Sequence, residues 1–474
     1  MVIVGGGIAG LAAAWFLRDE PADVTVLEGS PRLGGKLTAS EVAGVSVDAG
    51  AEALLRRRPE GTDLIKAVGL GEQLVLPGTT ASGIWSRGAV HPLPPRQFMG
   101  VPADLDGLAA SGVLSPAGLA RARQDLELPP TARDGDVPVA AYVGARFGPE
   151  LVDRLVDPLL GGVYAGRSDE LSFEATLGPL AAAAGPHRSL AEAAASLIPA
   201  PPAAPADGGE PAPRPAVFTT LAGGLGELPA AVAAAAKATI RTRATVRELA
   251  RTQHGWRLTV GSAADPEYLE ADAVVLALPA RPAARLLNGV PGASAAAAAL
   301  AAIEYASMAI VTLAYPRSRF PATQGQARSG YLVPAVERQA VKAVTFSTVK
   351  WPHLAAQPGR DDPIDIVRCS IGRIGEESVL QRDDTDLVAL AAADLAEQTG
   401  AQGPPVDARV TRWGGGLPQY AVGHLDRVAT IETAIAAQPG LAVCGAAYAG
   451  VGIPACIGTA QRAADRIRDF FIPE

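Results

Sequence analysis

The opening stretch of the chain alternates short apolar runs with glycine-rich or polar turns. In VIVGGGIAGLAAAWFLRD, the apolar run at residues 2–4 predicts a strand, the glycines predict a tight turn and the alanine-rich part predicts a helix. The next apolar run, DVTVLE, predicts a second strand that ends at Glu28. Strand, turn, helix and strand in this order are typical of a parallel α/β sheet.

The rest of the chain changes its periodicity twice. Residues 89–199 repeat apolar positions at helical spacing, most clearly between residues 139 and 160, and the Pro- and Ala-rich segment 200–216 predicts a linker. RATVRELARTQHGWRLTV and then EADAVVLALPA predict a small β-meander that returns to the first sheet. Residues 286–423 alternate strands and helices, and a Gly-rich loop from residue 444 leads into a closing helix predicted at 459–470.

We therefore predict an α/β protein of several parts. A Rossmann-like domain built from three separate chain segments stands beside a mainly helical domain and a mixed α+β substrate-binding domain. The expected boundaries are 1–88, 217–285 and 424–474 for the Rossmann-like domain, 89–199 for the helical domain, 200–216 for the linker and 286–423 for the substrate-binding domain.

Composition excludes several classes of protein. The 474 residues carry a net charge of −8, which does not favour nucleic-acid binding. Three cysteines without a C-x-x-C motif and five scattered histidines give no disulfide frame and no metal cluster, and they indicate a reducing compartment. No apolar stretch reaches the roughly 18 residues of a membrane-spanning helix, and the start lacks the pattern of a signal peptide.

The glycines near the start have the spacing of a dinucleotide-binding turn. Gly5, Gly7 and Gly10 form G-x-G-x-x-G directly after a strand, and Glu28 follows about 20 residues later, where a carboxylate binds ribose hydroxyls. Free N–H groups at the start of the helix would face a pyrophosphate. The expected cofactor contacts in this region are Gly5, Gly6, Gly7, Ile8, Ala9, Gly10, Glu28 and Gly29.

The segments that follow resemble flavin amine-oxidase-type proteins. Arg32, Gly35 and Lys36 belong to SPRLGGKL, which resembles the R-x-G-G-[RK] segment that lies along the FAD diphosphate. Asp48-Ala49-Gly50 resembles the acid-x-Gly after which the backbone passes the flavin ring, although Ala51 stands where the family usually has Pro. The resemblance implies FAD as cofactor, an amine-oxidase-type FAD-binding domain, and contacts from Gly50, Ala51, Glu52 and Ala53.

Over essentially the whole chain, the sequence resembles the oxygen-dependent porphyrinogen oxidases of haem synthesis. LVDPLLGGVYAGRSDELSFEATLGPL, RWGGGLPQY and CGAAYAGVGIPACI look like segments of that family, and HPLP, MGVP, HRSL and WPH look like its soluble, coproporphyrinogen-oxidising branch. The further contacts that this implies are Val246 for the adenine, Trp413 near the flavin, and Gly445, Val451, Gly452 and Ile453 around the ring and ribityl chain. Cys456 is interpreted as a packed thiol, so FAD is expected to be non-covalent.

The resemblance implies a six-electron oxidation of coproporphyrinogen III to coproporphyrin III, with O2 as acceptor and H2O2 as product. Flavin carries that chemistry, so no catalytic acid, base or metal is assigned. Protoporphyrinogen IX is the alternative substrate, and a ferrochelatase-type next enzyme of the pathway is a candidate partner. The expected location is the cytoplasm, with peripheral membrane contact left open.

The substrate site needs a flat apolar slot with cations at its rim, because the substrate carries propionates. The candidates are Arg57, Arg58, Gly162, Val163 and Tyr164. The run Arg56, Arg57, Arg58 is equally well explained as a solvated charge run, and Tyr164 as a core residue. Lys350 and Arg368 are further candidates for propionate binding.

Two other functions remain open at the level of sequence. An amine oxidase or desaturase would use the same fold, but the amine oxidase would need an aromatic cage for which only Tyr448 is suitably placed. A flavin-binding partner protein without turnover is the third possibility.

Overall fold

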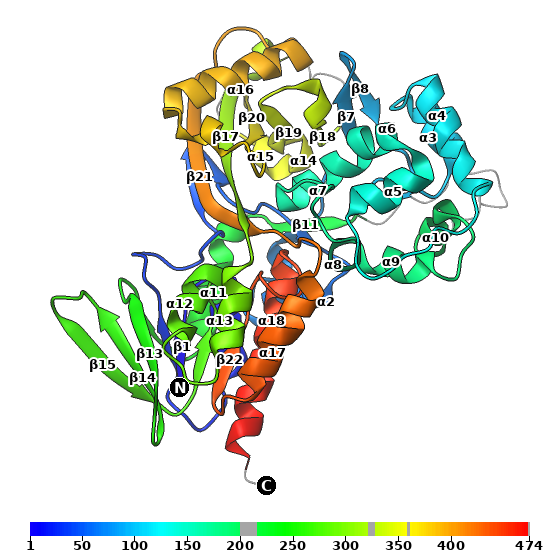
Figure 1. Ribbon diagram of the computed structural model, residues 1–474. Coiled ribbons are helices and arrows are strands. Elements are labelled where there is room, and N and C mark those ends of the chain that lie inside the picture. The colour runs from blue at the N-terminus through cyan, green and yellow to red at the C-terminus, as the bar shows by residue number, and fades with distance from the viewer. Residues whose placement is uncertain (200–215, 321–327, 358–360, 473–474) are drawn as a thin grey trace, which may run out of the picture.

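The computed structural model describes residues 1–199, 216–320, 328–357 and 361–472. It has a lower body built on a parallel sheet, an upper body built on a larger mixed sheet, and a helical lobe beside the upper body (Figure 1). The predicted linker 200–216 lies outside the described residues except for Ala216. No helix in the described ranges is both long and apolar enough to cross a membrane.

A five-stranded parallel sheet forms the centre of the lower body. Its order is β12-β2-β1-β16-β22 and every neighbouring pair is parallel. The strands come from the start, the middle and the end of the chain, which confirms the predicted assembly of this domain from three segments. They are β1 (Val2–Val4), β2 (Thr25–Leu27), β12 (Thr239–Arg241), β16 (Val274–Leu276) and β22 (Leu441–Val443).

Helices cover both faces of this sheet because successive strand residues point to opposite sides. Ile3 and Val275 pack on one side, and Val2 and Val274 on the other. The first side is covered by α1 (Ile8–Phe16), α2 (Pro59–Ala67), α11 (Leu228–Ala235) and α18 (Ile453–Phe471). The second side is covered by α12 (Ala280–Leu287), α13 (Ser294–Ala301) and α17 (His424–Ala436).

Two predicted boundaries differ from the packing around this sheet. The predicted middle segment of the domain ends at residue 285, whereas α13 also packs on the parallel sheet, since its Ala296 and Leu300 join the same core as Val274. The closing helix begins at Ile453 instead of 459, because Pro454 is tolerated in a first helical turn, where its missing N–H has no helical acceptor. The predicted meander is confirmed as an antiparallel sheet of β13 (Val246–Thr252), β14 (Gly255–Gly261) and β15 (Pro266–Ala271).

The upper body is a seven-stranded sheet of order β21-β17-β20-β19-β18-β7-β8. Its strands are β7 (Gly83–Ser86), β8 (Ala89–Pro92), β17 (Tyr305–Pro316), β18 (Gly330–Leu332), β19 (Val341–Phe346), β20 (Ile364–Ile371) and β21 (Asp407–Pro418). Helix α16 (Asp384–Thr399) covers one face. The boundary predicted at residue 88 therefore cuts a hairpin: β7 pairs with β18, so both strands of the hairpin belong to this sheet.

Short strands and turns link the two bodies. The hairpin of β3 (Ala39–Val42) and β4 (Val45–Asp48) packs through Val45 and Val47 on the free face of the upper sheet, against Ile366. Strand β11 (Phe218–Leu221) lies between β5 (Leu54–Leu55) and β6 (Leu74–Val75). The helices α14 (Ser347–Lys350) and α15 (Pro352–Ala355) connect β19 to β20.

The lobe is mainly helical, as its periodicity predicts, with one short hairpin of β9 (Gln97–Phe98) and β10 (Val101–Pro102). Between α6 (Pro149–Leu151) and α7 (Asp157–Tyr164) the helix widens into a π-helical segment at Val152–Val156. The other helices are α3 (Leu105–Ser111), α4 (Pro116–Arg123), α5 (Val139–Phe147), α8 (Phe173–Thr176), α9 (Gly178–Ala184) and α10 (Leu190–Ser196).

Candidate active site

Two helix N-termini without side-chain caps open on the same edge of the parallel sheet. Gly7 caps α1 and Gly452 caps α18, and neither helix has an acidic residue in its first turn. Because β1 and β22 are parallel strands of one sheet, the helices that follow them start at its carboxyl edge. Free N–H groups and the positive ends of two helix dipoles therefore face one crevice, which suits a phosphate or another anion.

The first glycine turn has the geometry that close approach of a ligand requires. Gly5 has φ +111°, and a Cβ at Gly10 would lie 1.9 Å from the Gly5 carbonyl oxygen. A Cβ at Gly7, by contrast, would meet no atom within 4 Å. The turn is thus tight on the protein side and open on the crevice side, at the place where a pyrophosphate would lie. Ile8 and Ala9 begin α1 behind this opening.

Glu28 lies at the end of β2, beside the glycine turn. Its carboxylate accepts hydrogen bonds from the backbone N–H groups of Gly6 and Ser30, both at 2.7 Å. The Ala244 N–H donates to the Glu28 carbonyl at 2.8 Å, so the start of β13, with Val246, lies next to Glu28 and Gly29. The structure brings these predicted cofactor residues together at one end of the crevice.

The loop with Arg32 and Lys36 continues the crevice toward the upper body. The Gly34 N–H donates to the Gly6 carbonyl at 2.8 Å, and the Arg32 guanidinium donates to the carbonyl of Gly35 at 2.9 Å. Desolvation lowers the pKa of the Lys36 ammonium, and the thiol of Cys456 is close enough to interact with it. This loop therefore lies between the turn of α1 and the turn of α18.

Gly50 and Trp413 form the next section of the crevice. A Cβ at Gly50 would lie 1.9 Å from the Lys36 carbonyl oxygen and 3.1 Å from the indole of Trp413. The Trp413 Nε1–H donates to the Ala49 carbonyl at 3.2 Å, and the Ala51 N–H donates to Lys36. The predicted loop and the predicted tryptophan thus touch although Gly50 and Trp413 lie 363 positions apart in the sequence.

Glu52 is held by Lys350 and Arg368, two cations that the sequence predicts only as candidates for substrate binding. Lys350 Nζ lies 2.6 Å from one carboxylate oxygen and Arg368 Nη1 lies 2.5 Å from the other. Burial opposes ionisation of Glu52, but the two cations outweigh it and lower its pKa to about 2. Arg368 also donates to the Gly50 carbonyl at 2.6 Å, so the cluster fixes the backbone of residues 50–52; Ala53 follows before β5.

The closing loop is fixed by a tyrosine to which sequence reasoning assigned no role. Tyr420 lies in RWGGGLPQY; its hydroxyl accepts from the Gly450 N–H and donates to the Ala446 carbonyl, both at 2.7 Å. Gly445 N–H donates to Thr459 at 2.9 Å. The loop is thereby shaped around Val451, Gly452 and Ile453 at the N-terminus of α18.

Cys456 is a packed thiol. Its residue is buried at the start of α18, and its sulfur lies 4.0 Å from the Val451 carbonyl oxygen. Burial raises the pKa of the thiol to about 11, so it is protonated near neutral pH.

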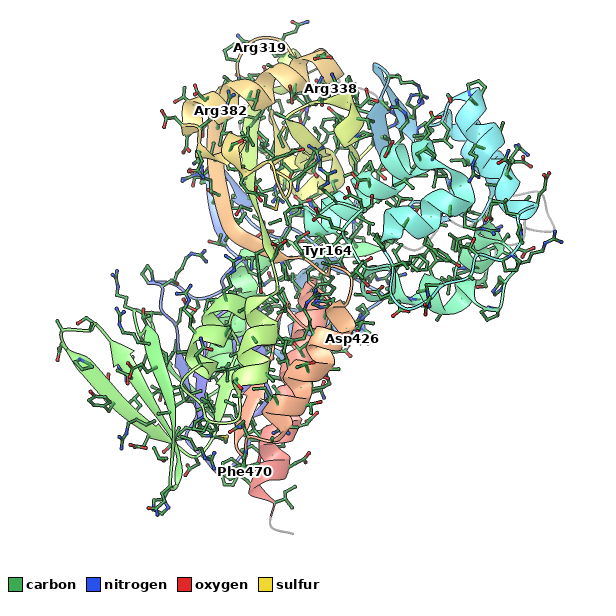
Figure 2. The ribbon with its side chains drawn as sticks, in the orientation of Figure 1. Tyr164, Arg319, Arg338, Arg382, Asp426 and Phe470 are labelled. Atoms are coloured by element: carbon green, nitrogen blue, oxygen red, sulfur yellow. The ribbon has the colours of Figure 1, made fainter. Side chains whose placement is uncertain are left out.

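The predicted substrate residues fall into two groups. Gly162 and Val163 are exposed near the end of α7, whereas Tyr164 is buried with its ring 5.4 Å from the ring of Tyr420. Figure 2 shows Tyr164 where the lobe meets the two bodies. Arg57 and Arg58 are exposed at the start of α2, and Arg58 pairs with Glu60 at 2.6 Å.

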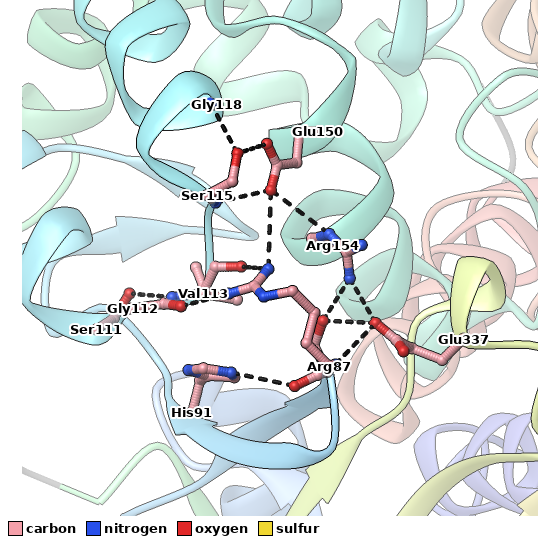
Figure 3. A network of polar contacts seen from close by, with 11 residues as sticks. Arg87, His91, Ser111, Gly112, Val113, Ser115, Gly118, Glu150, Arg154 and Glu337 are labelled. Carbon is pink, nitrogen blue, oxygen red and sulfur yellow. Dashed lines mark hydrogen bonds and ion pairs between the residues drawn. The ribbon is translucent and has the colours of Figure 1, made fainter.

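A polar network holds the lobe against the upper sheet (Figure 3). Arg154, in the π-helical segment, donates to the Ser86 hydroxyl on β7 and to the Glu337 carboxylate beyond β18. Glu150 accepts from the N–H and the hydroxyl of Ser115 at 2.8 and 2.6 Å. Because α7 continues the same helix, this network also sets where Gly162 and Val163 lie.

Among the residues that the structure describes, no group of three His, Cys, Asp or Glu side chains could hold a metal ion. What the crevice offers is backbone N–H groups, one carboxylate at a strand end and a tryptophan. Such an arrangement of donors suits a dinucleotide.

Comparison with known proteins agrees with this geometry. The family model for flavin-containing amine oxidoreductases matches residues 8–468. A coproporphyrinogen III oxidase of Mycobacterium tuberculosis is 38% identical over 467 residues, which cover 97% of this chain and 95% of the relative. One of Bacillus subtilis is 31% identical over 473 residues, covering 98% and 96%. A crystal structure from Exiguobacterium sp. 255-15 superposes with a TM-score of 0.83 at 31% identity over 98% of both chains. The chain therefore belongs to the family of flavin-containing amine oxidoreductases.

Proposed function

We propose that this protein oxidises coproporphyrinogen III to coproporphyrin III with non-covalently bound FAD and O2. The observation that carries the proposal is the near full-length likeness to relatives named coproporphyrinogen III oxidase, at 31–38% identity. The crevice adds independent support, because its chemistry suits a dinucleotide. Gly5–Gly10, Glu28 and the Arg32–Lys36 loop would hold the adenine nucleotide and diphosphate, and Gly50, Trp413 and the loop before Ile453 would hold the flavin ring.

The residues that line the crevice fit FAD. Two uncapped helix N-termini converge on the crevice, and the position of a Gly7 Cβ is open space. When bound, FAD supplies the two-electron chemistry, taking a hydride equivalent from the macrocycle and passing the electrons to O2. Three such oxidations remove six electrons and six protons from the porphyrinogen and yield three H2O2.

The chain's own residues would orient the flavin and enclose the site. The Glu52 cluster would keep the backbone at Gly50 in place against the ring, and the positive end of α18 would stabilise negative charge on a reduced ring. Gly162 and Val163 offer an exposed, partly apolar surface for a flat macrocycle. The network of Arg154 would hold that surface at a fixed separation from the sheet.

A second candidate is oxidation of protoporphyrinogen IX. A protoporphyrinogen oxidase of Bos taurus is 29% identical over 98% of both chains, whereas the coproporphyrinogen III oxidases of Mycobacterium tuberculosis and Bacillus subtilis are 38% and 31% identical. The amine-oxidase alternative is less well supported, because Tyr448 is buried in the core below the parallel sheet and does not form a cage. Cytoplasmic location and a handover of porphyrin to a ferrochelatase-type enzyme also remain proposals.

The test is aerobic oxidation of both porphyrinogens by the purified yellow protein, followed by porphyrin fluorescence against an enzyme-free blank and by H2O2 formation. Higher kcat/KM for coproporphyrinogen III is expected. Higher kcat/KM for protoporphyrinogen IX would favour the second candidate. Turnover at the rate of the blank with both substrates, with FAD bound, would refute an oxidase and favour a non-catalytic flavin protein.

A further inference from the structure

The C-terminal turn of α7 is held on one side by donors from the upper sheet and the loop that follows β20. Most carbonyl groups in the last turn of a helix lack a helical partner, so donors from outside the helix decide where the turn lies. Three contacts do this here: Lys342 Nζ to the Gly161 carbonyl oxygen at 3.5 Å, the Gln419 side chain to the Tyr164 carbonyl at 2.8 Å, and the Ile374 N–H to the Ala165 carbonyl at 2.8 Å. On its other side, at Gly162 and Val163, the turn is exposed.

Lys342 reaches this turn because β19 is irregular at that point. The pairing of β19 with β20 shifts between Val341 and Ala343, so that Lys342 is the extra residue of a β-bulge. A bulge redirects a side chain that strict alternation would place on the other face of the sheet, and bulges are common next to active sites. Val341 accordingly packs in the core beneath α16, whereas Lys342 reaches α7.

The amino group of Lys342 is buried and forms no salt bridge within the described ranges. The residue is 5% exposed. The charged groups that act on it are Arg373, which is 7% exposed, and Glu376, which pairs with Arg373 at 3.4 Å. Burial and then the charge of Arg373 lower the pKa of Lys342 to about 7, and Glu376 opposes this only in part. The ammonium and the neutral amine are therefore both populated near neutral pH.

Other titratable groups around β19 have partners elsewhere or stay neutral. Burial raises the pKa of Tyr164 on α7 and of Cys369 on β20. The remaining pairs are Asp157 of α7 with Ser168, Asp394 of α16 with the Val341 N–H, Glu397 of α16 with Gln339, Tyr331 of β18 with Gln398, Asp365 of β20 with Arg317, and Lys350 of α14 and Arg368 of β20 with Glu52. Of the charged groups named, Lys342 is the one whose side chain contacts the C-terminal turn of α7.

We propose that Lys342 positions the α7 turn for the tetrapyrrole and that its positive charge favours binding of the anionic macrocycle. The proposal rests on the proposed function. Gly162 and Val163 would contact the macrocycle, and the ammonium lies behind them, next to Gly161. A charge in the protein interior is screened less than one in water, so it would attract propionates that it does not touch. Lys342 acts through the turn and through its field, and is thus a positioning residue.

The test compares Lys342→Met and Lys342→Arg with the wild type. Replacing a buried charge by an apolar side chain of similar volume does not lower stability, so Lys342→Met should fold. KM and kcat for coproporphyrinogen III are measured for each holoenzyme between pH 6 and pH 9. At pH 6 we expect KM of Lys342→Met to exceed the wild-type value by about threefold to tenfold, while kcat changes less than about twofold.

The pH profile separates the effect of charge from that of shape. Propionates stay ionised above pH 6, whereas the ammonium of Lys342 loses its proton as the pH passes its pKa of about 7. Wild-type KM should therefore rise between pH 6 and pH 9 toward that of Lys342→Met, which should stay constant. Lys342→Arg keeps its charge throughout, so its KM should remain near the wild-type value at pH 6.

Two controls identify the source of the effect. Lys66→Met removes the same charge from an exposed position in the last turn of α2 and should leave KM unchanged at every pH. Coproporphyrin III tetramethyl ester has no ionised carboxylates, so it should bind wild-type protein and Lys342→Met with the same Kd.

Two results would overturn the inference. One is an unchanged KM in Lys342→Met at pH 6. The other is an equal rise in KM in Lys342→Met and Lys342→Arg at every pH, which would assign Lys342 a role in shape alone. If the wild type oxidises no porphyrinogen, the proposed function fails instead. The Kd of coproporphyrin III, measured without turnover from quenching of its fluorescence, still tests Lys342 in that case, so the two failures are distinguishable.

Discussion

Glu52→Gln tests the electrostatics beside the crevice. The substitution keeps the size of the side chain and removes its charge, which leaves Lys350 and Arg368 without their shared anion; both cations have side chains less than one-fifth exposed. The pKa of Glu52 falls from 4.5 to about 2 on folding. At about 1.36 kcal/mol for each pKa unit, the ionised group contributes roughly 3 kcal/mol to stability. Breaking a buried ion pair by removing one partner costs a similar 3–5 kcal/mol or so.

The sign of the pH dependence follows from the depressed pKa. Stabilisation by Glu52 is fully present above pH 4.5 and is lost as the pH falls toward 2. At pH 3.5 about nine-tenths of this carboxyl is protonated in the unfolded chain, so the free-energy difference between variant and wild type should be smaller than at pH 7 by on the order of 1 kcal/mol. Urea unfolding followed by tryptophan fluorescence at both pH values measures this difference.

The matched control is Glu267→Gln, which breaks an exposed pair with Arg241 at 2.5 Å. Exposed pairs contribute little to stability because water and salt screen them, so this variant should unfold nearly as the wild type does. The reasoning is refuted if Glu52→Gln costs no more than the control at pH 7. It is equally refuted if the cost stays constant down to pH 3.5.

Three further changes test other parts of the molecule. Gly7→Ala should weaken FAD binding at least tenfold, measured from flavin absorbance during a titration. The stability of the apoprotein should not change, because the added Cβ enters open space. The control Gly178→Ala, where a Cβ is equally free, should change neither FAD binding nor stability. Burial lowers the pKa of Lys342 to about 7, so Lys342→Met should stabilise the protein by about 1–4 kcal/mol at pH 7. This gain in stability should shrink as the pH rises toward 10.5, because the lysine then becomes neutral in the unfolded chain as well. A gain that does not depend on pH would contradict the prediction. Arg154→Met should lower the free energy of unfolding in urea by about 3 kcal/mol, because it leaves the Glu337 carboxylate without its partner. Adding Glu337→Met should restore most of this free energy. If stability does not recover in the double variant, Arg154 and Glu337 do not act as a pair.

The parts of the fold and site that sequence predicts are those encoded by local spacing. Gly5, Gly7, Gly10 and Glu28 belong to one βαβ unit, whose geometry leaves little choice of where the turn and the acid lie. The order of apolar runs likewise predicts the parallel sheet, and the glycine-rich loop and helix at the end of the chain predict its return to that sheet; the strand β22 that precedes the loop is not predicted.

The parts that sequence does not predict depend on partners distant in the chain. Glu52 meets Lys350 and Arg368 only because the loop after β4 lies against α14 and β20, and a charge in a sequence does not identify its partner. Tyr420 acquires its role when its hydroxyl reaches the loop before α18. The hairpin of β7 and β8 joins the upper sheet through strand pairing, which apolar periodicity alone does not specify.

The three-segment assembly of the parallel sheet has a consequence for synthesis of the protein. Helix α1 buries its apolar side against α18, which begins 437 residues after α1 ends (453 − 16). At roughly 5–20 residues per second, a ribosome needs about 20–90 s to make the intervening chain. Throughout that time Leu11 and Ile65 lack their final neighbours, so the nascent chain depends on chaperones or on transient collapse to avoid aggregation. The cofactor crevice also closes late in synthesis, because α18, which forms its second wall, follows every strand of the parallel sheet along the chain.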